Sequence, residues 1–416
     1  MTTGEAFDDP RMRGFRSRHS VEDVLALIDR RVARLGSEPI AGLSEAAGRV
    51  LAGPIVSTRS VPGFDRSAMD GYALRGEETF GADPYSPIAF EVVGRVRPGR
   101  GGAVRVGPGQ AVEIATGAPI PEGADTVVRV EATERDGATV RVVEPTPPGR
   151  HVGKKGEDVE AGTQILPGGR VLRPQDLGVL SAIGAGRFEV VRRPRVCVIV
   201  TGDELVPAGS VPEGPSIADA NSPMLEALIA RDGGIADVVG PILDDRDILR
   251  SAVLDASKVA DLILISGGSS TGPEDHAPGL VAELGELAVH GVAIRPASPA
   301  GLGFLGEIPV VLLPGNPVSC LCAYDFFGGP IVRKLGGRAK DWPYRPVERP
   351  MGRKLASVVG RVDYARVLLA DGAIEPIATS GASILSSTTR ADGFVVVPSD
   401  LEGYPVGAVV TAWLYD

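Results

Sequence analysis

The most constraining feature of this sequence is a short apolar segment that ends in a glycine-rich loop. Leu262–Ile265 is continuously apolar, as expected of a parallel strand covered on both faces. The chain then turns through Gly267 and Gly268 into hydroxyl residues and reaches the acid Asp275. Such a loop can direct backbone N–H groups and hydroxyls at an anion, and ligands of open α/β sheets bind at carboxyl strand ends. The alternative is an ordinary turn whose glycines only provide special backbone angles.

Other predicted strands in this region also end in polar residues. Helices expected between the strands imply a parallel sheet with right-handed crossovers. The strand ends that this sheet would bring to one edge are Thr201–Glu204, Asp244 with Asp245, Gly267–Asp275 and Gly315–Ser319. Acids occur at three of these ends, which favours a shared site over isolated capping residues.

Capping and periodicity predict several helices. Ser20 and Asp23 form a capping pattern before an apolar stripe, so a helix is expected from Val21 that Gly36 can end. A second short helix is expected over Ser44–Leu51. After Asp219-Ala220-Asn221, Ser222 is expected to be the N-cap of a further helix.

At 416 residues the chain is too long for a single hydrophobic core, so several domains are expected. The predicted fold is α/β multidomain, with a central parallel-sheet α/β domain, a small β domain, a segmented connecting domain and a C-terminal β-barrel-like domain. The expected bounds are a tail at 1–18, the connecting domain at 19–60 and 148–186, the small β domain at 61–147, the α/β domain at 187–337 and the C-terminal domain at 338–416.

Composition limits the partners. The net charge of −10 argues against general nucleic-acid binding, which needs a basic face, but not against a small anion held by a metal or a local basic pocket. The three cysteines form no disulfide framework. No apolar run approaches the roughly 20 residues that span a membrane, so a cytoplasmic protein is expected.

Several motifs are informative as an ordered set. They are Pro62-x-Phe-Asp-x-Ser-Ala-Met-Asp-Gly-Tyr-Ala73, Thr116-Gly-Ala-Pro-x-Pro-x-Gly-Ala-Asp125, Gly156-Glu-Asp158, Thr201-Gly-Asp-Glu-Leu205, Asp219-x-Asn221, Gly267-Gly-x-Ser-x-Gly272 with Asp275, and Pro314-Gly-Asn-Pro-x-Ser319. From about residue 20 to the C-terminus, the set resembles the molybdopterin molybdenumtransferase family, the bacterial MoeA type and its animal relative, the gephyrin E domain.

The resemblance implies insertion of molybdate into adenylylated molybdopterin (molybdopterin-AMP), with release of AMP and with Mg²⁺ as the cofactor. It also implies a homodimer with shared active sites, and transient contact with other proteins of cofactor biosynthesis. The residues expected to be catalytic are Asp70, Asp158, Glu204, Asp244 and Asp275, of which Glu204, Asp244 and Asp275 are expected to hold the metal. The residues expected to bind substrate are Asp65, Ser67, Thr116, Gly267, Gly268, Ser270, Thr271, Gly272, Arg295, Pro314, Gly315, Asn316 and Ser319.

One segment departs from the family pattern. Many relatives carry lysines and a Pro-Gly-Lys-Pro run where this chain reads His290-Gly-Val-Ala-Ile-Arg295-Pro-Ala-Ser-Pro299. Arg295 keeps one positive charge there, with a planar guanidinium in place of a point charge. The alternatives to the transferase are an adenylyltransferase-like enzyme, which shares the Gly-Gly-x-Ser loop, and a non-catalytic scaffold of the gephyrin E-domain type.

Overall fold

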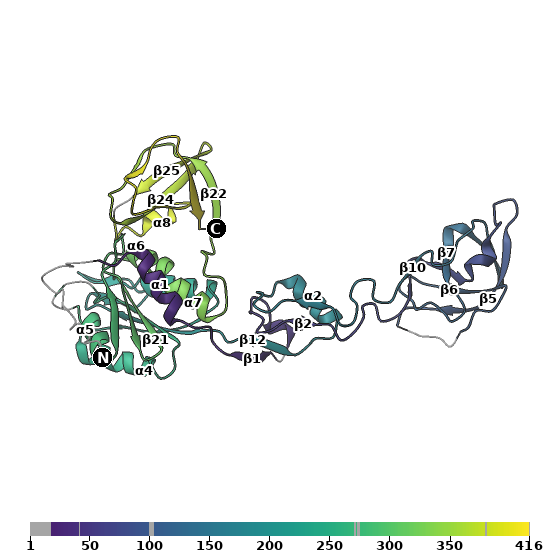
Figure 1. Cartoon of the computed structure of the whole chain (residues 1–416), viewed down its shortest axis with the longest axis horizontal. Helices are drawn as coiled ribbons and strands as arrows, with labels where there is room; N and C mark the ends of the chain where they lie inside the picture. Colours follow the sequence, from purple (N-terminus) through teal and green to yellow (C-terminus); the bar gives the residue numbers. More distant parts are fainter. Residues whose placement is uncertain are drawn as a thin grey trace. The chain divides into compact units, whose positions relative to one another are not determined.

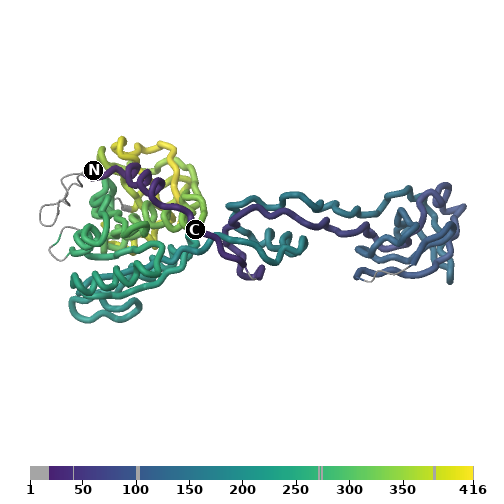
Figure 2. The backbone as a smooth tube through the Cα atoms, turned by 60° about the horizontal axis from the view of Figure 1, so that its bottom comes forward, coloured from purple at the N-terminus to yellow at the C-terminus, as the bar shows by residue number. Residues whose placement is uncertain are grey.

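The computed structural model describes residues 18–40, 42–99, 104–269, 272, 275–378 and 381–415. The chain forms two compact units (Figures 1 and 2). Unit one comprises Met1–Pro39, Gly48–Ala52 and Glu189–Asp416; unit two comprises Ile40–Ala47 and Gly53–Phe188. The α/β multidomain fold predicted from the sequence is confirmed.

The centre of unit one is a six-stranded sheet. Its strands in spatial order are β16 (Ile235–Ile242), β13 (Arg195–Thr201), β17 (Leu262–Ser266), β21 (Ile308–Leu313), β20 (Gly301–Leu305) and β18 (Glu286–His290). The strands from β16 to β21 run parallel, as predicted. The β20–β18 hairpin adds antiparallel pairing at one edge, which the sequence analysis did not foresee.

Helices cover both faces of this sheet. They are α1 (Val21–Arg31), α3 (Asn221–Arg231), α4 (Arg246–Ala256), α5 (Ala277–Leu284), α6 (Pro317–Ala323), a π-helical turn over Tyr324–Gly328, and α7 (Gly329–Leu335). Alternate residues of β17 enter different cores: Leu264 joins the core under α1, α3 and α7, whereas Ile263 joins the core under α4 and α5. Burial on both faces explains why the strand is continuously apolar.

The C-terminal part of unit one is a second six-stranded sheet. Its strands are β19 (Ile294–Arg295), β24 (Val362–Ala370), β26 (Gly393–Val397), β28 (Val409–Leu414), β22 (Arg345–Pro350) and β25 (Ala373–Ala378). Shorter elements are β23 (Leu355–Ala356), β27 (Gly403–Tyr404) and α8 (Ser386–Thr389). Because β19 comes from the α/β region and pairs with β24, Arg295 is the register partner of Asp363.

Unit two contains its own β sheet. Its strands in spatial order are β7 (Thr126–Arg129), β4 (Gly71–Leu74), β6 (Gln110–Ile114), β5 (Ile88–Val96), β9 (Thr139–Val142) and β8 (Thr133–Asp136). Smaller elements are β2 (Ile55–Val56) with β11 (Gln164–Leu166), β3 (Arg66–Ser67) with β10 (Val152–Gly153), and α2 (Pro174–Ala182). β1 (Ser37–Ile40) pairs with β12 (Phe188–Val191), and β14 (Leu205–Val206) in unit one pairs with β15 (Ile217–Ala218).

The predicted C-terminal limit of the first helix is wrong. Ser20 accepts a hydrogen bond from the Asp23 N–H as expected, but α1 ends at Arg31 and not near Gly36. The chain straightens at Val32, and the Leu35 N–H then donates to the carbonyl of Leu335 beyond the helix. Contacts within unit one therefore compete with continuation of the helix.

Two other helix predictions also fail. Only a 3₁₀ turn over Leu43–Glu45 forms where a helix over Ser44–Leu51 was expected, because Gly48 takes φ +73° and Leu51 bridges to Val190 in extended form. Ser222 is not the N-cap of α3: the Asp219 carboxylate accepts from the N–H groups of Asn221 and Ser222. An acid two residues before the helix thus satisfies its first donors.

A buried polar cluster joins the α/β region to the C-terminal sheet. Asp325, in the π-helical turn, is fully buried and accepts hydrogen bonds from the hydroxyls of Tyr344 and Tyr364. Arg231 forms an ion pair with it at 3.5 Å. Burial outweighs these partners and raises the pKa of Asp325 to about 6.

No helix in the described ranges is long and apolar enough to cross a membrane.

The raised pKa of Asp325 predicts a pH-dependent stability term. Between its ordinary value of 3.8 and about 6, the folded chain keeps a proton that the unfolded chain has lost. The contribution of this proton to the free energy of unfolding is therefore complete below this pH window and is lost as the pH rises through it. Relative to Asp325→Asn, the wild type should lose at most about 3 kcal/mol of unfolding free energy across the window, and nothing further above it.

Urea unfolding of both proteins at several pH values measures this difference, with the exposed Asp400→Asn variant as a control for losing a surface carboxylate. A wild-type advantage that grew as the pH rose would mean that the carboxyl is held ionised.

Candidate active site

Four strand ends of unit one surround one cavity of about 610 Å³. Its lining residues from these ends are Thr201, Gly202, Glu204, Asp244, Ser266, Gly267, Gly268, Ser269, Asp275, Pro314, Gly315, Asn316 and Pro317. Additional walls come from Leu205, Ile217–Asn221, Pro299 and Ser383. The parallel register of β17 and β21, with Ser266 opposite Leu313, brings the two glycine-containing loops together.

The loop after β17 requires glycine for a steric reason. Gly267 has φ +102° and Gly268 has φ +54°. A Cβ at Gly267 would lie 2.2 Å from the carbonyl oxygen of Thr201, a distance that no side chain could accept. A Cβ at Gly315 would lie 3.6 Å from the Cα of Gly267, so the two loops approach backbone to backbone. This leaves room at the strand ends for a ligand.

The three carboxylates expected to hold the metal line the same cavity. Asp244 accepts a 2.5 Å hydrogen bond from the Thr201 hydroxyl, and Asp275 accepts one of 2.5 Å from the Gly272 N–H. Glu204 lines the cavity from the loop after β13. Among the described residues, however, no three His, Cys, Asp or Glu side chains are already grouped to hold a metal ion.

A second cavity, of about 370 Å³, adjoins the first and shares Pro299, Pro314 and Asn316 with it. Arg295 and Ser319, expected among the substrate-binding residues, lie here and not in the larger cavity. Arg295 forms an ion pair with the buried Asp363, its register partner in β24. Ser270 and Thr271 lie outside the described residues.

The site residues expected in unit two gather at one group of loops. The Asp70 carboxylate accepts from the Thr116 N–H at 2.8 Å. Asp65 accepts from the Lys155 N–H at 2.8 Å and pairs with Lys154 at 3.0 Å, and the first of these contacts contributes most to lowering its pKa.

Two other expected residues of unit two differ in exposure. Ser67 is buried, and its hydroxyl donates to the Met69 carbonyl at 2.5 Å, so it holds the turn. Asp158 is exposed and follows Glu157, which pairs with Arg66 at 2.8 Å. Three sequence motifs far apart in the chain thus form one loop cluster.

Asn221 is a site residue that the sequence analysis quoted but did not assign. Its amide nitrogen donates to the Ser266 hydroxyl at 2.9 Å and to the Gly315 carbonyl at 2.8 Å, so it links the ends of β17 and β21. Its Oδ1 is buried and makes no hydrogen bond within the described part of the chain. The Asp219-x-Asn221 motif was the signal: it served as a helix start and as part of the family resemblance, but no role was assigned to Asn221. Arg18, Ser298 and Arg361, in the second cavity, were missed as well.

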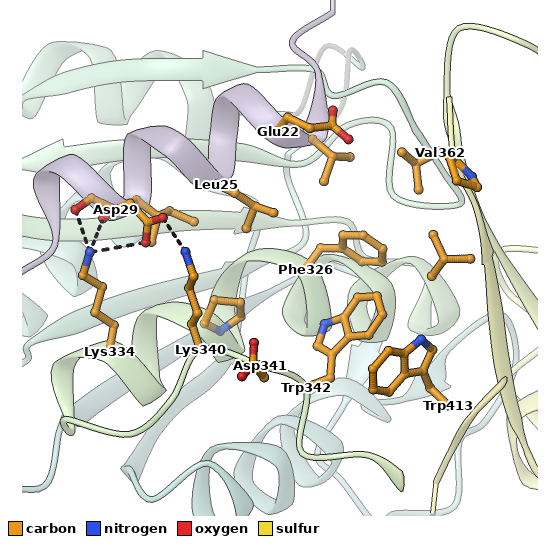
Figure 3. Close-up of a pocket in the computed structure, with 15 residues that line it drawn as sticks. Glu22, Leu25, Asp29, Phe326, Lys334, Lys340, Asp341, Trp342, Val362 and Trp413 are labelled. Atoms are coloured by element: carbon orange, nitrogen blue, oxygen red, sulfur yellow. Dashed lines mark hydrogen bonds and ion pairs between the residues drawn. The ribbon is translucent and has the colours of Figure 1, made fainter. Parts of the chain in front are cut away.

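A separate cavity of about 470 Å³ lies between α1, α7 and the C-terminal sheet (Figure 3). Trp342 and Trp413 form part of its wall, and Asp29 pairs with Lys334 and Lys340 at one end. The acids that line this cavity outnumber these two lysines, and none of the glycine loops reaches it. It therefore lacks the net positive charge and the loop N–H groups that an anionic substrate needs.

Comparison with known proteins agrees with this combination of fold and site. The sequence matches the MoeA N-terminal region (domain I and II) over residues 19–184, a probable molybdopterin binding domain over 197–334, and the MoeA C-terminal region (domain IV) over 348–415. Molybdopterin molybdenumtransferase 2 of Mycobacterium tuberculosis is 36% identical over 381 residues, which cover 89% of this chain and 93% of that protein.

Two further relatives extend the comparison. Molybdopterin molybdenumtransferase of a Nostoc species is 36% identical, covering 78% of this chain and 76% of that protein. The crystal structure of the molybdopterin biosynthesis MoeA protein from Pyrococcus horikoshii superposes with a TM-score of 0.84 at 34% identity, covering 96% of this chain and all of that one. The chain belongs to the molybdopterin molybdenumtransferase family, whose members are enzymes of molybdenum cofactor biosynthesis.

The close approach at Gly267 predicts that alanine is not tolerated there. Gly267→Ala should lower the free energy of unfolding by about 1–3 kcal/mol, because the residue must keep a strained φ or the loop must move away from Thr201. Gly279→Ala is the matched control, since no atom lies within 4 Å of its added Cβ in α5. The control should gain roughly 0.5–1 kcal/mol from helix propensity. Urea unfolding compares the two, and equal stabilities would contradict the steric account.

Proposed function

We propose that this chain inserts molybdate into adenylylated molybdopterin with release of AMP, assisted by Mg²⁺. The observation that carries the proposal is the pairing of two adjoining cavities. One has glycine loops and carboxylates at four strand ends, and the other has arginine side chains. Two adjoining cavities of this kind would bind a pterin phosphoanhydride and a small oxyanion side by side.

The larger cavity suits the pterin substrate. Backbone N–H groups of the Gly267 and Gly315 loops are the kind of donor that binds phosphate oxygens at strand ends. The buried Oδ1 of Asn221 can accept a hydrogen bond from a ring or amino N–H of the pterin, which would compensate its burial. The substrate would then lie with its anhydride toward the acids.

The donor set also fits a hard cation. Asp244, Asp275 and Glu204 offer carboxylate oxygens from three strand ends of one cavity. Mg²⁺ usually takes one or two carboxylates together with substrate phosphates, so the lack of a preformed group of three ligands within the described residues is compatible with it. When bound, Mg²⁺ would neutralise charge on the cleaved anhydride. Thr201 and the Gly272 N–H orient two of the carboxylates by the hydrogen bonds described above.

The smaller cavity suits molybdate. Arg295 offers a guanidinium there and is held in position by Asp363. The shared wall of Pro299, Pro314 and Asn316 would allow the oxyanion to approach the pterin without crossing bulk solvent. Charge-assisted hydrogen bonds from guanidinium to oxyanion oxygens are short and strong.

We further propose a homodimer in which Asp70 and Thr116 of one subunit complete the site of the other. The support is that acids expected in the site are divided between unit two, with Asp70, and unit one, with Asp275. In related proteins, according to the resemblance, the small β domain reaches the partner. Transient contact with other proteins of cofactor biosynthesis is part of the same proposal.

The acids are expected to act on the chemical step. Asp275→Asn and Glu204→Gln should each fold normally and lower turnover by about 100-fold, because charge that develops on the anhydride would lose its metal-mediated stabilisation. Molybdate-dependent release of AMP from molybdopterin-AMP measures this, at several Mg²⁺ concentrations. Glu307→Gln, an exposed acid outside the cavity, is the control. Near-normal turnover in folded Asp275→Asn would contradict the assignment.

Shared sites predict complementation between inactive variants. After subunit exchange between Asp70→Asn and Asp275→Asn, each heterodimer would contain one site with both defects and one intact site. Random mixing makes about half of the dimers heterodimeric, so roughly a quarter of the wild-type activity should return. Exchange is verified with two affinity tags. No recovery despite exchange would show that each subunit builds its own site.

A further inference from the structure

The smaller cavity receives a side chain from the very beginning of the described chain. Arg18 lines it together with Arg295 and Arg361. The three residues come from distant parts of the sequence: Arg18 precedes α1, Arg295 lies in β19 and Arg361 directly precedes β24. All belong to unit one, so their neighbourhood is a property of a single compact body.

Backbone hydrogen bonds hold the Arg18 segment in place. The His19 N–H donates to the Gly291 carbonyl at 3.0 Å, and the His19 carbonyl accepts from the Ala293 N–H at 2.8 Å. His19 thereby forms a parallel bridge with Val292, in the segment that leads into Arg295. The position of Arg18 at the cavity thus follows from main-chain pairing.

The side chains around this cavity carry a net positive charge. Asp363 is 1% exposed and pairs with both Arg295 and Arg361, the latter at 3.2 Å. The Ser357 hydroxyl also donates to it at 2.6 Å. Two arginines against one carboxylate leave one positive charge, and Arg18, for which no ion pair occurs within the described ranges, raises this to two.

Donors at this cavity also lack partners. The Nε atom of Arg295 and the hydroxyl of Ser298 are buried and make no hydrogen bond among the described residues. Buried donors without acceptors cost free energy that a bound ligand can recover. Ser298 is neutral, so the charged side chains that line this cavity are the three arginines.

We propose that Arg18 is an oxyanion-binding residue of this cavity and that it sets the preference for a divalent oxyanion. It supplies one of the positive charges of this cavity from the N-terminal segment. With Arg18 the cavity carries two net positive charges, which match a tetrahedral dianion such as molybdate. The identity of the oxyanion as molybdate rests on the function proposed above, whereas the role of Arg18 rests on the cavity.

The test measures binding of molybdate alone to the full-length protein by isothermal titration calorimetry, without a pterin substrate. Arg18→Gln should weaken molybdate binding roughly 5- to 10-fold, the loss expected for one hydrogen bond to a charged group that is partly solvated. Arg18→Lys should recover at least half of this loss in log affinity, since it keeps the charge. Arg30→Gln, which removes an exposed arginine of α1 outside the cavity, is the matched control and should bind like the wild type.

A second ligand separates charge matching from a general structural effect. Perrhenate is a tetrahedral monoanion of similar size to molybdate. Arg18→Gln should weaken molybdate binding more than perrhenate binding, so the selectivity ratio should fall. In turnover assays the half-saturating molybdate concentration should rise by the same factor at unchanged kcat. Thermal unfolding midpoints verify that the variants are folded.

The outcomes distinguish the inference from the proposed function. If Arg295→Gln weakens molybdate binding while Arg18→Gln behaves like Arg30→Gln, the role of Arg18 is overturned and the oxyanion cavity stands. Equal weakening of molybdate and perrhenate would also overturn the charge-matching role. If the wild type binds no molybdate and Arg295→Gln leaves the half-saturating concentration unchanged, the proposed oxyanion site itself fails.

Discussion

The register between β17 and β21 is the constraint on which the site depends. With Ser266 opposite Leu313, the two strands end together and their loops leave the sheet at the same level. Only glycine at position 267 permits the approach to Thr201, and Asn221 then links both loop bases by two hydrogen bonds. The buried strand β17 therefore does more than fill the core, because the position of its end determines where acids and N–H donors face the larger cavity. A shift of one residue would separate them.

The second cavity depends on a different pairing. β19 leaves the α/β region and joins β24 of the C-terminal sheet, which brings Arg295 beside Asp363 and Arg361. The buried cluster at Asp325, whose hydrogen bond from Tyr364 engages the same strand β24, joins the two regions at another point. The smaller cavity therefore lies where the two sheets are held together, and its geometry depends on their contact.

Sequence patterns predicted the parts of this site that are local. Apolar strands followed by glycines, hydroxyls and acids were sufficient to expect one shared edge, since parallel strand order follows from alternating helices and strands. The patterns were insufficient where contacts between residues far apart in the sequence determine the structure. Nothing local indicates that Val32 will leave α1, that β19 will join another sheet, or that Asn221 will reach Gly315. Arg295 was expected to bind substrate, and the structure places it in the smaller cavity, which sequence patterns could not distinguish from the neighbouring one.

Local charge, and not total charge, governs what such a chain can bind. The protein carries a net charge of −10, and four carboxylates line the larger cavity, where they would repel an anionic substrate without a cation. The smaller cavity has the opposite sign because Asp363 is outnumbered by arginines. Adjacent cavities of opposite polarity would hold two anions by different means, one through a bound cation and one through guanidinium groups. Because main-chain bonds at His19 hold the segment that carries Arg18, the balance in the smaller cavity depends on a part of the chain remote in sequence from every glycine loop.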